Sequence, residues 1–241
     1  MVAYHGANVV VTGGTGALGT AVVAALRAAG AVCHVTNMVA AELDHYPHRN
    51  DSGVHITTGI DLADEAAVRR FYASLPPLWG SVHLAGGFAM SPVADTSAVD
   101  FADQFQMNAL SSFLCSAAAI RAIRSRTEPV AGGVKGGRIV NVAARPGLEP
   151  RLGAGMVAYA TAKAAVAAMT EALAQETAGE EIWINAVAPS VLDTPANRRA
   201  MPDADYSTWV APAAVAEVIA FLASPDNRVT RGAVIPVYGG A

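Results

Sequence analysis

Short apolar runs alternate with longer segments of helical periodicity from one end of the chain to the other. The apolar runs predict strands at residues 9–11, 31–36, 55–60, 81–85, 138–142, 182–187 and 233–237. The periodic segments predict helices at residues 20–29, 64–75, 100–124, 157–177 and 211–223. Alternation of strand and helix without an internal repeat predicts an α/β fold with a parallel, doubly wound sheet. Residues 1–241 are therefore expected to form one domain.

A glycine-rich turn joins the first expected strand to the first helix. From Gly14 the spacing is G-x-G-x-x-G, in which the glycines permit a tight turn, let the backbone approach a pyrophosphate and let the helix pack close to the strand. The N–H groups at the start of that helix favour an anion. Such a turn can also serve chain reversal alone, but its place at the start of a βα unit favours nucleotide binding. The residues expected to contact the cofactor here are Gly13, Thr15, Gly16, Ala17, Leu18 and Gly19.

The composition of the chain limits the kinds of molecule that it is expected to bind. Apolar residues make up 53% of the chain and charged residues 15%, yet no uncharged apolar run reaches the roughly 18 residues of a membrane span. The net charge of −4 disfavours nucleic acid and anionic membranes as partners. Cys33 and Cys115 stand without a motif and are expected to be buried thiols, and the histidines in residues 44–48 are expected to lie in a solvated loop rather than a metal site. Residues 1–8 lack the features of a signal peptide, so a cytoplasmic protein is expected. Because residues 44–48 have no partner that completes a ligand spacing, no bound metal is expected.

Polar residues and glycines follow several other strands, at the ends where open α/β sheets bind ligands. Asn37 follows the second strand, where an acidic residue would contact the adenosine ribose of NAD and an arginine just beyond it would favour NADP. Because no Arg or Lys stands there or in the glycine turn, a modest preference for NADH is expected, with Asn37 bonded to a ribose hydroxyl. Asp61 is expected to face the adenine or to cap the next segment. Gly86 and Gly87 suit the close approach of a flat ligand.

Tyr159 and Lys163 carry the strongest indication of chemistry. Four residues apart, they share one face of a helix, so the ammonium can stabilise the phenolate, lower the pKa of the phenol and make it a general acid or base. The alternative is an aromatic ring packed on a lysine stem. Asn108, in the middle of a helical segment, is expected to be either exposed or bonded to a specific partner. The polar segment around residues 190–210 is expected to be a lid over the substrate, since it holds several aromatic residues.

The ordered motifs together resemble the short-chain dehydrogenase/reductase family along nearly the whole chain. They are the glycine turn, Ala85-Gly86, Asn108, Tyr159-x-x-x-Lys163, Pro189 and the ending Val237-Tyr238-Gly239-Gly240. The resemblance implies a seven-stranded Rossmann sheet, an NAD(H) or NADP(H) cofactor, hydride transfer to a small molecule, and a homo-oligomer, either a tetramer or a dimer. It also implies that Tyr159 exchanges the proton, Lys163 binds the nicotinamide ribose, Asn108 holds a water of the proton relay and Thr194 contacts the carboxamide.

One departure from the family pattern concerns the substrate. The usual N-x-S-S after the fifth strand is Asn141-Val142-Ala143-Ala144, so the serine that bonds a substrate carbonyl is missing. The turn G-G-x-G-A-L-G and residues 192–209 resemble the dihydropteridine reductase branch, whose quinonoid pterin substrate accepts hydride with less need of that hydroxyl. Reduction of a pterin-like or other conjugated substrate is therefore the leading hypothesis. The alternatives are a carbonyl reductase or alcohol dehydrogenase in which another group replaces the serine, and a non-catalytic NAD(P)-binding regulator.

Overall fold

Seven parallel strands form the central sheet. The computed structural model describes residues 3–240. The strands are β1 (Asn8–Thr12), β2 (Val32–Asn37), β3 (Val54–Thr58), β4 (Leu78–His83), β5 (Gly137–Val142), β6 (Ile182–Pro189) and β7 (Val234–Val237). Their order is β3-β2-β1-β4-β5-β6-β7, and every neighbouring pair is parallel. The predicted fold, a single-domain doubly wound sheet of the Rossmann type, is confirmed.

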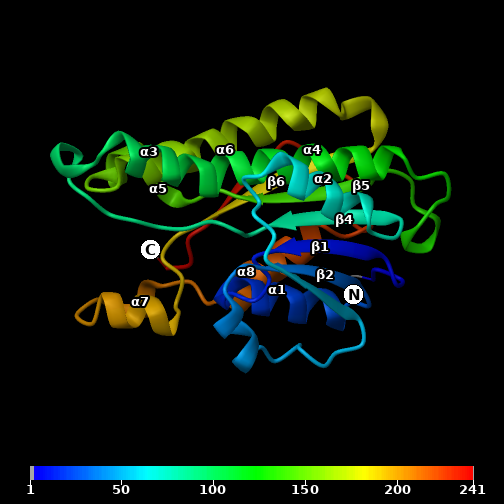
Figure 1. Cartoon of the computed structure of the whole chain (residues 1–241), viewed down its shortest axis with the longest axis horizontal. Coiled ribbons are helices and arrows are strands. Elements are labelled where there is room, and N and C mark those ends of the chain that lie inside the picture. Colours follow the sequence, from blue (N-terminus) through cyan, green and yellow to red (C-terminus); the bar gives the residue numbers. More distant parts are fainter. Residues whose placement is uncertain (1–2, 241) are drawn as a thin grey trace.

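Helices cover both faces of the sheet, as Figure 1 shows, with α1 and α8 on one side and α2, α4 and α6 on the other. The α-helices are α1 (Ala17–Ala28), α2 (Glu65–Ala73), α3 (Ala98–Phe105), α4 (Ser111–Arg124), α5 (Arg145–Leu148), α6 (Val157–Glu176), α7 (Pro195–Ala200) and α8 (Pro212–Leu222). Short 3₁₀ helices are η1 (Ala40–His45), η2 (Val93–Asp95), η4 (Ala131–Gly133), η5 (Pro150–Gly153), η6 (Ala178–Glu180) and η7 (Tyr206–Thr208). Within residues 3–240, no helix combines the length and apolar character needed to cross a bilayer.

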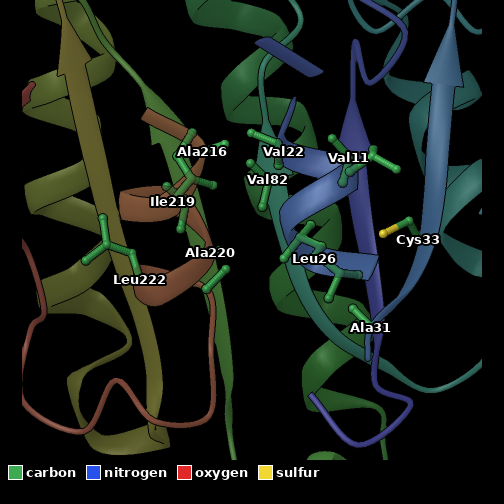
Figure 2. Packing of buried hydrophobic residues seen from close by; sticks show 14 of the residues in the cluster. Val11, Val22, Leu26, Ala31, Cys33, Val82, Ala216, Ile219, Ala220 and Leu222 are labelled. Atoms are coloured by element: carbon green, nitrogen blue, oxygen red, sulfur yellow. The ribbon is translucent and has the colours of Figure 1, made fainter. Parts of the chain in front are cut away.

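Apolar side chains between the sheet and helices α1 and α8 form the largest core cluster. In Figure 2, Val22 and Leu26 of α1 and Ile219 of α8 gather over the same face of the sheet as Val11. Burying these side chains is worth about 1.5–3 kcal/mol each, which makes this layer a main source of stability. The expected burial of the thiols of Cys33 and Cys115 is confirmed.

The bounds of several expected elements differ from the structure. The first helix, α1, begins at Ala17, three residues before its predicted start. The fourth strand begins at Leu78, before the predicted start, and ends at His83, two residues before the predicted end. Beyond it, the N–H groups of Leu84 and Ala85 both bond to the Thr12 hydroxyl. The helix predicted over residues 100–124 is divided into α3 and α4 by the π-helical turn η3 (Gln106–Leu110). This turn contains Asn108, so the interruption falls at a candidate site residue.

Candidate active site

The candidate site lies where β1 and β4 are neighbours in the sheet. From β1 the chain runs outward to β2 and β3 on one side, and from β4 to β5, β6 and β7 on the other. Loops leaving the carboxyl ends of β1 and β4 therefore diverge, which is where open α/β sheets bind ligands. The Thr12 hydroxyl accepts hydrogen bonds from the backbone N–H groups of Leu84 and Ala85, at 3.1 and 3.2 Å, and ties the two strand ends together.

The glycine turn has the geometry of a phosphate-binding loop. Gly13 adopts φ +63°, and a Cβ there would lie 3.0 Å from backbone atoms of Ala85. A Cβ on Gly19 would lie 2.3 Å from the carbonyl oxygen of Gly13, so only glycine lets α1 start this close to the strand. A Cβ on Gly16 would meet one atom only, at 3.6 Å, which leaves the approach to the start of α1 open. The turn therefore fits the pyrophosphate of a dinucleotide.

A cleft of about 670 Å³ opens at these strand ends, and we call it the switch-point cleft. Nine of its lining residues are expected cofactor contacts, namely Gly13, Thr15, Gly16, Ala17, Leu18, Gly19, Asp61, Ala85 and Gly86. Other expected site residues lie outside its lining, namely Asn37, Gly87, Asn108, Tyr159, Lys163, Pro189 and Thr194. The structure thus brings nine of the dinucleotide-binding candidates together, and Asn108 and Lys163 lie beside Gly86.

Asn37 lies beneath the cleft surface and only 3% of it is exposed. Its Nδ2 group donates to the Thr15 hydroxyl at 2.8 Å, to the carbonyl of Val39 at 3.0 Å and to the carboxylate of Glu42 at 3.2 Å. Asp61 lines the cleft and its carboxylate accepts a hydrogen bond from Ala63 N–H at 2.8 Å. Asp61 therefore combines the two roles that the sequence suggested as alternatives: it faces the cleft, and it caps the segment that follows β3.

Asn108 connects the π-turn to the loop after β4. It is 2% exposed, and its Nδ2 group donates to the carbonyls of Gly87 and Gln104, at 3.0 and 2.9 Å. Its Oδ1 accepts from Gly87 N–H at 3.3 Å. A Cβ on Gly86 would lie 2.6 Å from Asn108 Oδ1 and 3.7 Å from Lys163 Nζ, so a side chain at this position would collide. Of the two possibilities for Asn108, exposure or a specific partner, the structure shows the second: the side chain is buried and hydrogen-bonded to Gly87 and Gln104.

Lys163 is buried, and its Nζ donates to the carbonyl of Val142 at 2.8 Å. Burial lowers the pKa of Lys163 to about 8, because a charged ammonium loses hydration there. Nζ lies 5.8 Å from the centre of the Tyr159 ring. The two side chains share one face of α6, as their spacing predicted.

The prediction that Lys163 lowers the pKa of Tyr159 is wrong in this structure. Burial raises the pKa of Tyr159 to about 12, since desolvation disfavours the phenolate and the ammonium bonds to Val142 instead. Within residues 3–240 the Tyr159 hydroxyl has no hydrogen-bond partner. The phenol is therefore protonated at neutral pH, which suits a proton donor.

The surroundings of Tyr159 are apolar and aromatic. The ring of Phe88 stands edge-on to it, with centres 4.9 Å apart and planes at 88°. Ala143 and Ala144 are buried at the end of β5 and offer methyl groups where the family pattern has serines. Pro189 ends β6, and the Thr194 hydroxyl caps α7 by accepting from Asn197 N–H at 3.2 Å. α7, orange in Figure 1, lies beyond the carboxyl ends of the strands.

Sequence reasoning missed Glu42 and Phe88. Glu42 stands in a polar segment read as a solvated loop, and Phe88 follows the glycine pair without periodicity of its own. The missed signal was the distance along the chain from a strand end: both residues come within about five positions of one. The loops that follow parallel strands all begin at the same edge of the sheet, where ligands bind. Side chains in the first few positions of these loops are therefore candidate site residues even where no motif is found.

Comparisons with known proteins agree with this geometry. The model of the short chain dehydrogenase family matches residues 7–205. Galactitol 2-dehydrogenase from Rhizobium johnstonii is 30% identical over 251 residues, covering 98% of this chain and 95% of the relative. L-xylulose reductase from Bos taurus is 27% identical, covering 98% and 96%. The solved structure of ElxO with NADP bound superposes with a TM-score of 0.84 at 24% identity, covering 98% of each chain. The chain belongs to the short-chain dehydrogenase/reductase family and is an NAD(P)-dependent oxidoreductase.

Proposed function

We propose that this oxidoreductase reduces a flat, conjugated, electron-poor substrate of the pterin type, with Tyr159 as the proton donor. The observation that carries the proposal is the setting of Tyr159, whose ring stands edge-on to the ring of Phe88 and whose hydroxyl has no hydrogen-bond partner within residues 3–240. Burial raises the pKa of this phenol to about 12, which keeps it protonated. A reduction consumes a proton as well as a hydride. A phenol without an internal partner can donate its proton to the substrate.

The chain's own residues supply binding and orientation. N–H groups at the start of α1 hold the pyrophosphate, and Asp61 faces the adenine end. Lys163, oriented by Val142, binds the nicotinamide ribose, while Thr194 contacts the carboxamide and Asn108 holds a relay water beside Gly87. The bound dinucleotide supplies the hydride. Residues 190–210, with α7 and the neighbouring rings of Tyr206 and Trp209, which are tilted by 55° to each other, serve as the lid over the substrate.

The side chains around Tyr159 support a conjugated substrate. Phe88 is largely exposed and presents an aromatic surface on which a flat ring can stack. Ala143 and Ala144 offer no side-chain hydroxyl to polarise a carbonyl. A substrate that accepts hydride readily has less need of one.

A second candidate is a carbonyl or polyol oxidoreductase. It is favoured by the names of the two relatives, galactitol 2-dehydrogenase and L-xylulose reductase, which align with nearly all of this chain. In that case a backbone N–H or a lid residue takes over the role of the missing serine. Tyr159 and Lys163 act in the same way for both candidates.

A spectrophotometric screen separates the two. Oxidation of NADH and NADPH is followed with quinonoid dihydropterin and with ketones and aldehydes, and reduction of NAD⁺ and NADP⁺ with polyols. We expect turnover with the pterin and weak turnover with the carbonyl panel. The variant Ala144→Ser restores the hydroxyl: a large gain on ketones with none on pterins would favour the carbonyl candidate, and no gain on either class would favour the pterin candidate.

We also propose that the chain forms a homo-oligomer through α3 and α4, the helices on either side of the π-turn that holds Asn108. Large apolar side chains are exposed on α3 and α4, among them Val99, Phe101, Phe105 and Phe113. A helix that is apolar on more than one face needs a second partner, and a second copy of this chain offers a matching surface. Light scattering at micromolar concentration is expected to give the mass of a dimer or tetramer, and a monomer mass would contradict this proposal.

A further inference from the structure

An acidic side chain that the glycine motif does not include stands at the adenosine end of the switch-point cleft. Glu42 belongs to the 3₁₀ turn η1, which begins three residues after β2 ends. It lines the cleft together with Thr15 and Gly16 of the glycine turn and with Met38 and Val39. Glu42 thus reaches the region where a dinucleotide fold binds the adenosine ribose, although it is five residues beyond the expected position, Asn37.

Hydrogen bonds hold the carboxylate in place. The Thr15 hydroxyl donates to Glu42 Oε2, and Asn37 Nδ2 donates to the same oxygen at 3.2 Å. Asn37 Nδ2 also donates to Thr15 Oγ1 at 2.8 Å, so Asn37, Thr15 and Glu42 form a closed triangle. Only one carboxylate oxygen is used in this triangle. The other, Oε1, accepts no hydrogen bond within residues 3–240, which leaves it available to a ligand.

Asn37 itself is a poor candidate for recognising the ribose. Its Nδ2 group has three acceptors within the protein, and its Oδ1 is buried without a hydrogen-bond partner among the described residues. A ribose in the cleft therefore faces the carboxylate that Asn37 positions, not the amide.

The charge of the cleft reinforces this arrangement. Its described lining holds three carboxylates, Glu42, Asp61 and Asp103, and neither lysine nor arginine. Within residues 3–240 no cation forms an ion pair with Glu42. A 2′-phosphate would therefore enter a lining that is negative and holds no guanidinium or ammonium; Arg49, whose guanidinium donates to the carbonyl of Leu43 at 3.5 Å, lies outside this lining.

We propose that Glu42 is the residue that makes this site prefer NAD(H) to NADP(H), by accepting a hydrogen bond from the 2′-hydroxyl of the adenosine ribose and repelling a 2′-phosphate. This inference rests on the proposed function, since it concerns the cofactor of the same site. Thr15 and Asn37 are positioning residues for the carboxylate. Because the carboxylate is reached by solvent, its repulsion of the phosphate weakens as salt rises.

Binding titrations test the assignment without any turnover. Dissociation constants of NADH and NADPH are measured by fluorescence, and those of ADP-ribose and 2′-phospho-ADP-ribose by calorimetry, since the latter pair lacks the nicotinamide. The wild type is expected to bind each unphosphorylated ligand at least about tenfold more tightly than its phosphorylated partner at low salt. Glu42→Gln keeps the size of the side chain and removes the charge, and it should reduce that ratio to about threefold or less, mainly through tighter binding of the phosphorylated ligands.

Asp44→Asn is the matched control, because it removes one negative charge from the same 3₁₀ turn at an exposed residue outside the cleft lining. It should leave all four dissociation constants within about twofold of wild type. Equal binding of NADH and NADPH by the wild type, or a ratio unchanged in Glu42→Gln, would overturn the role of Glu42 and leave the proposed oxidoreductase intact. Failure of all four ligands to bind would contradict the proposed function itself. An equal change of ratio in Asp44→Asn would show a diffuse charge effect and would also overturn the assignment.

Discussion

The two faces of the sheet are held by different interactions. On the face covered by α1 and α8, apolar contacts predominate: Val9, Val11, Leu26 and Ile219 are fully buried in one cluster. The buried hydrogen bonds of this cluster run from Tyr4 and Trp79 to backbone carbonyls at the end of α8. Hydrophobic contact is not directional, so the apolar contacts stabilise the fold without defining the position of a side chain to a fraction of an ångström.

The face covered by α2, α4 and α6 contains a buried polar chain besides its apolar residues. Ser81 bonds to His83 Nε2 at 2.8 Å, and His83 Nδ1 bonds to Asn141 Oδ1 at 2.8 Å. Asn141 Nδ2 donates to the Thr170 hydroxyl at 3.0 Å, and the Ser112 hydroxyl donates to Asn141 Oδ1 at 3.1 Å. Since Asn141 Oδ1 only accepts, His83 carries its proton on Nδ1 and accepts from Ser81 at Nε2.

The polar hydrogen bonds connect the sheet to the helices near the candidate active site. Ser112 follows the π-turn that holds Asn108, and Thr170 lies on α6 about two turns from Lys163. Directional bonds from one strand residue, Asn141, therefore define the positions of α4, which follows the π-turn of Asn108, and of α6, which carries Tyr159 and Lys163. The apolar face maintains the fold, and the polar face maintains the geometry of the site.

The largest expected effect separates activity from stability on the polar face. Tyr159→Phe should lower turnover by about 10² to 10⁴ because the proton donor is lost, while the melting temperature and the affinity for the dinucleotide stay near wild type. Steady-state kinetics, thermal unfolding and fluorescence titration measure the three quantities. Tyr46→Phe is the control, since the buried Tyr46 hydroxyl has no partner within residues 3–240 and its removal should leave turnover unchanged. Near-normal turnover of Tyr159→Phe would refute the catalytic role.

The apolar face should show the opposite behaviour. Ile219→Ala removes a fully buried side chain between α8 and the sheet and should lower the free energy of unfolding by about 2–5 kcal/mol. Turnover per folded molecule should not change. Urea unfolding measures the first quantity and active-site titration the second. The exposed Val229 provides the control, as Val229→Ala should change stability by no more than about 0.5 kcal/mol.

Acid should lower the free energy of unfolding, because protonation of His83 disrupts the buried polar chain. Burial lowers the pKa of His83 to about 4, whereas the unfolded chain titrates near the ordinary value of 6.5. The stabilising effect of keeping His83 neutral is complete above pH 6.5 and is lost as the pH falls toward 4, at up to about 1.4 kcal/mol per pH unit. Urea unfolding across this range should show a smaller slope for His83→Gln than for wild type. His34, whose pKa burial also lowers to about 4, should maintain part of the slope.

The smallest expected effect tests the link from Asn141 to α6. Thr170→Val keeps the shape of the side chain but removes the acceptor of Asn141 Nδ2, and it should cost about 1 kcal/mol of stability. Turnover should fall by about threefold to tenfold with little change in dinucleotide affinity, because α6 loses a directional contact. Thr170→Ser retains the hydroxyl and should restore turnover. A loss of stability without any change in turnover would show that Thr170 has no positioning role.

Local sequence patterns predicted much of the fold. The run at residues 9–11, the glycine turn and the helical period after it each involve near neighbours in the chain, so their structure follows from backbone sterics and side-chain periodicity. The pairing of Tyr159 with Lys163 on one face of α6 follows in the same way from the helical repeat. Alternation of such units then restricts the sheet to parallel, right-handed crossovers.

Contacts between distant residues were decided only by the tertiary structure. Asn108 meets Gly87, and Glu42 meets Thr15, across spans of chain that no local pattern describes. The pKa of Tyr159 is set by its burial, since the ammonium of Lys163 bonds to the carbonyl of Val142 and not to the phenol. The spacing of the two residues along the helix does not reveal either fact. The physical reason is that periodicity shows which face of an element a residue occupies, whereas partner and degree of burial depend on which other elements the fold places against that face.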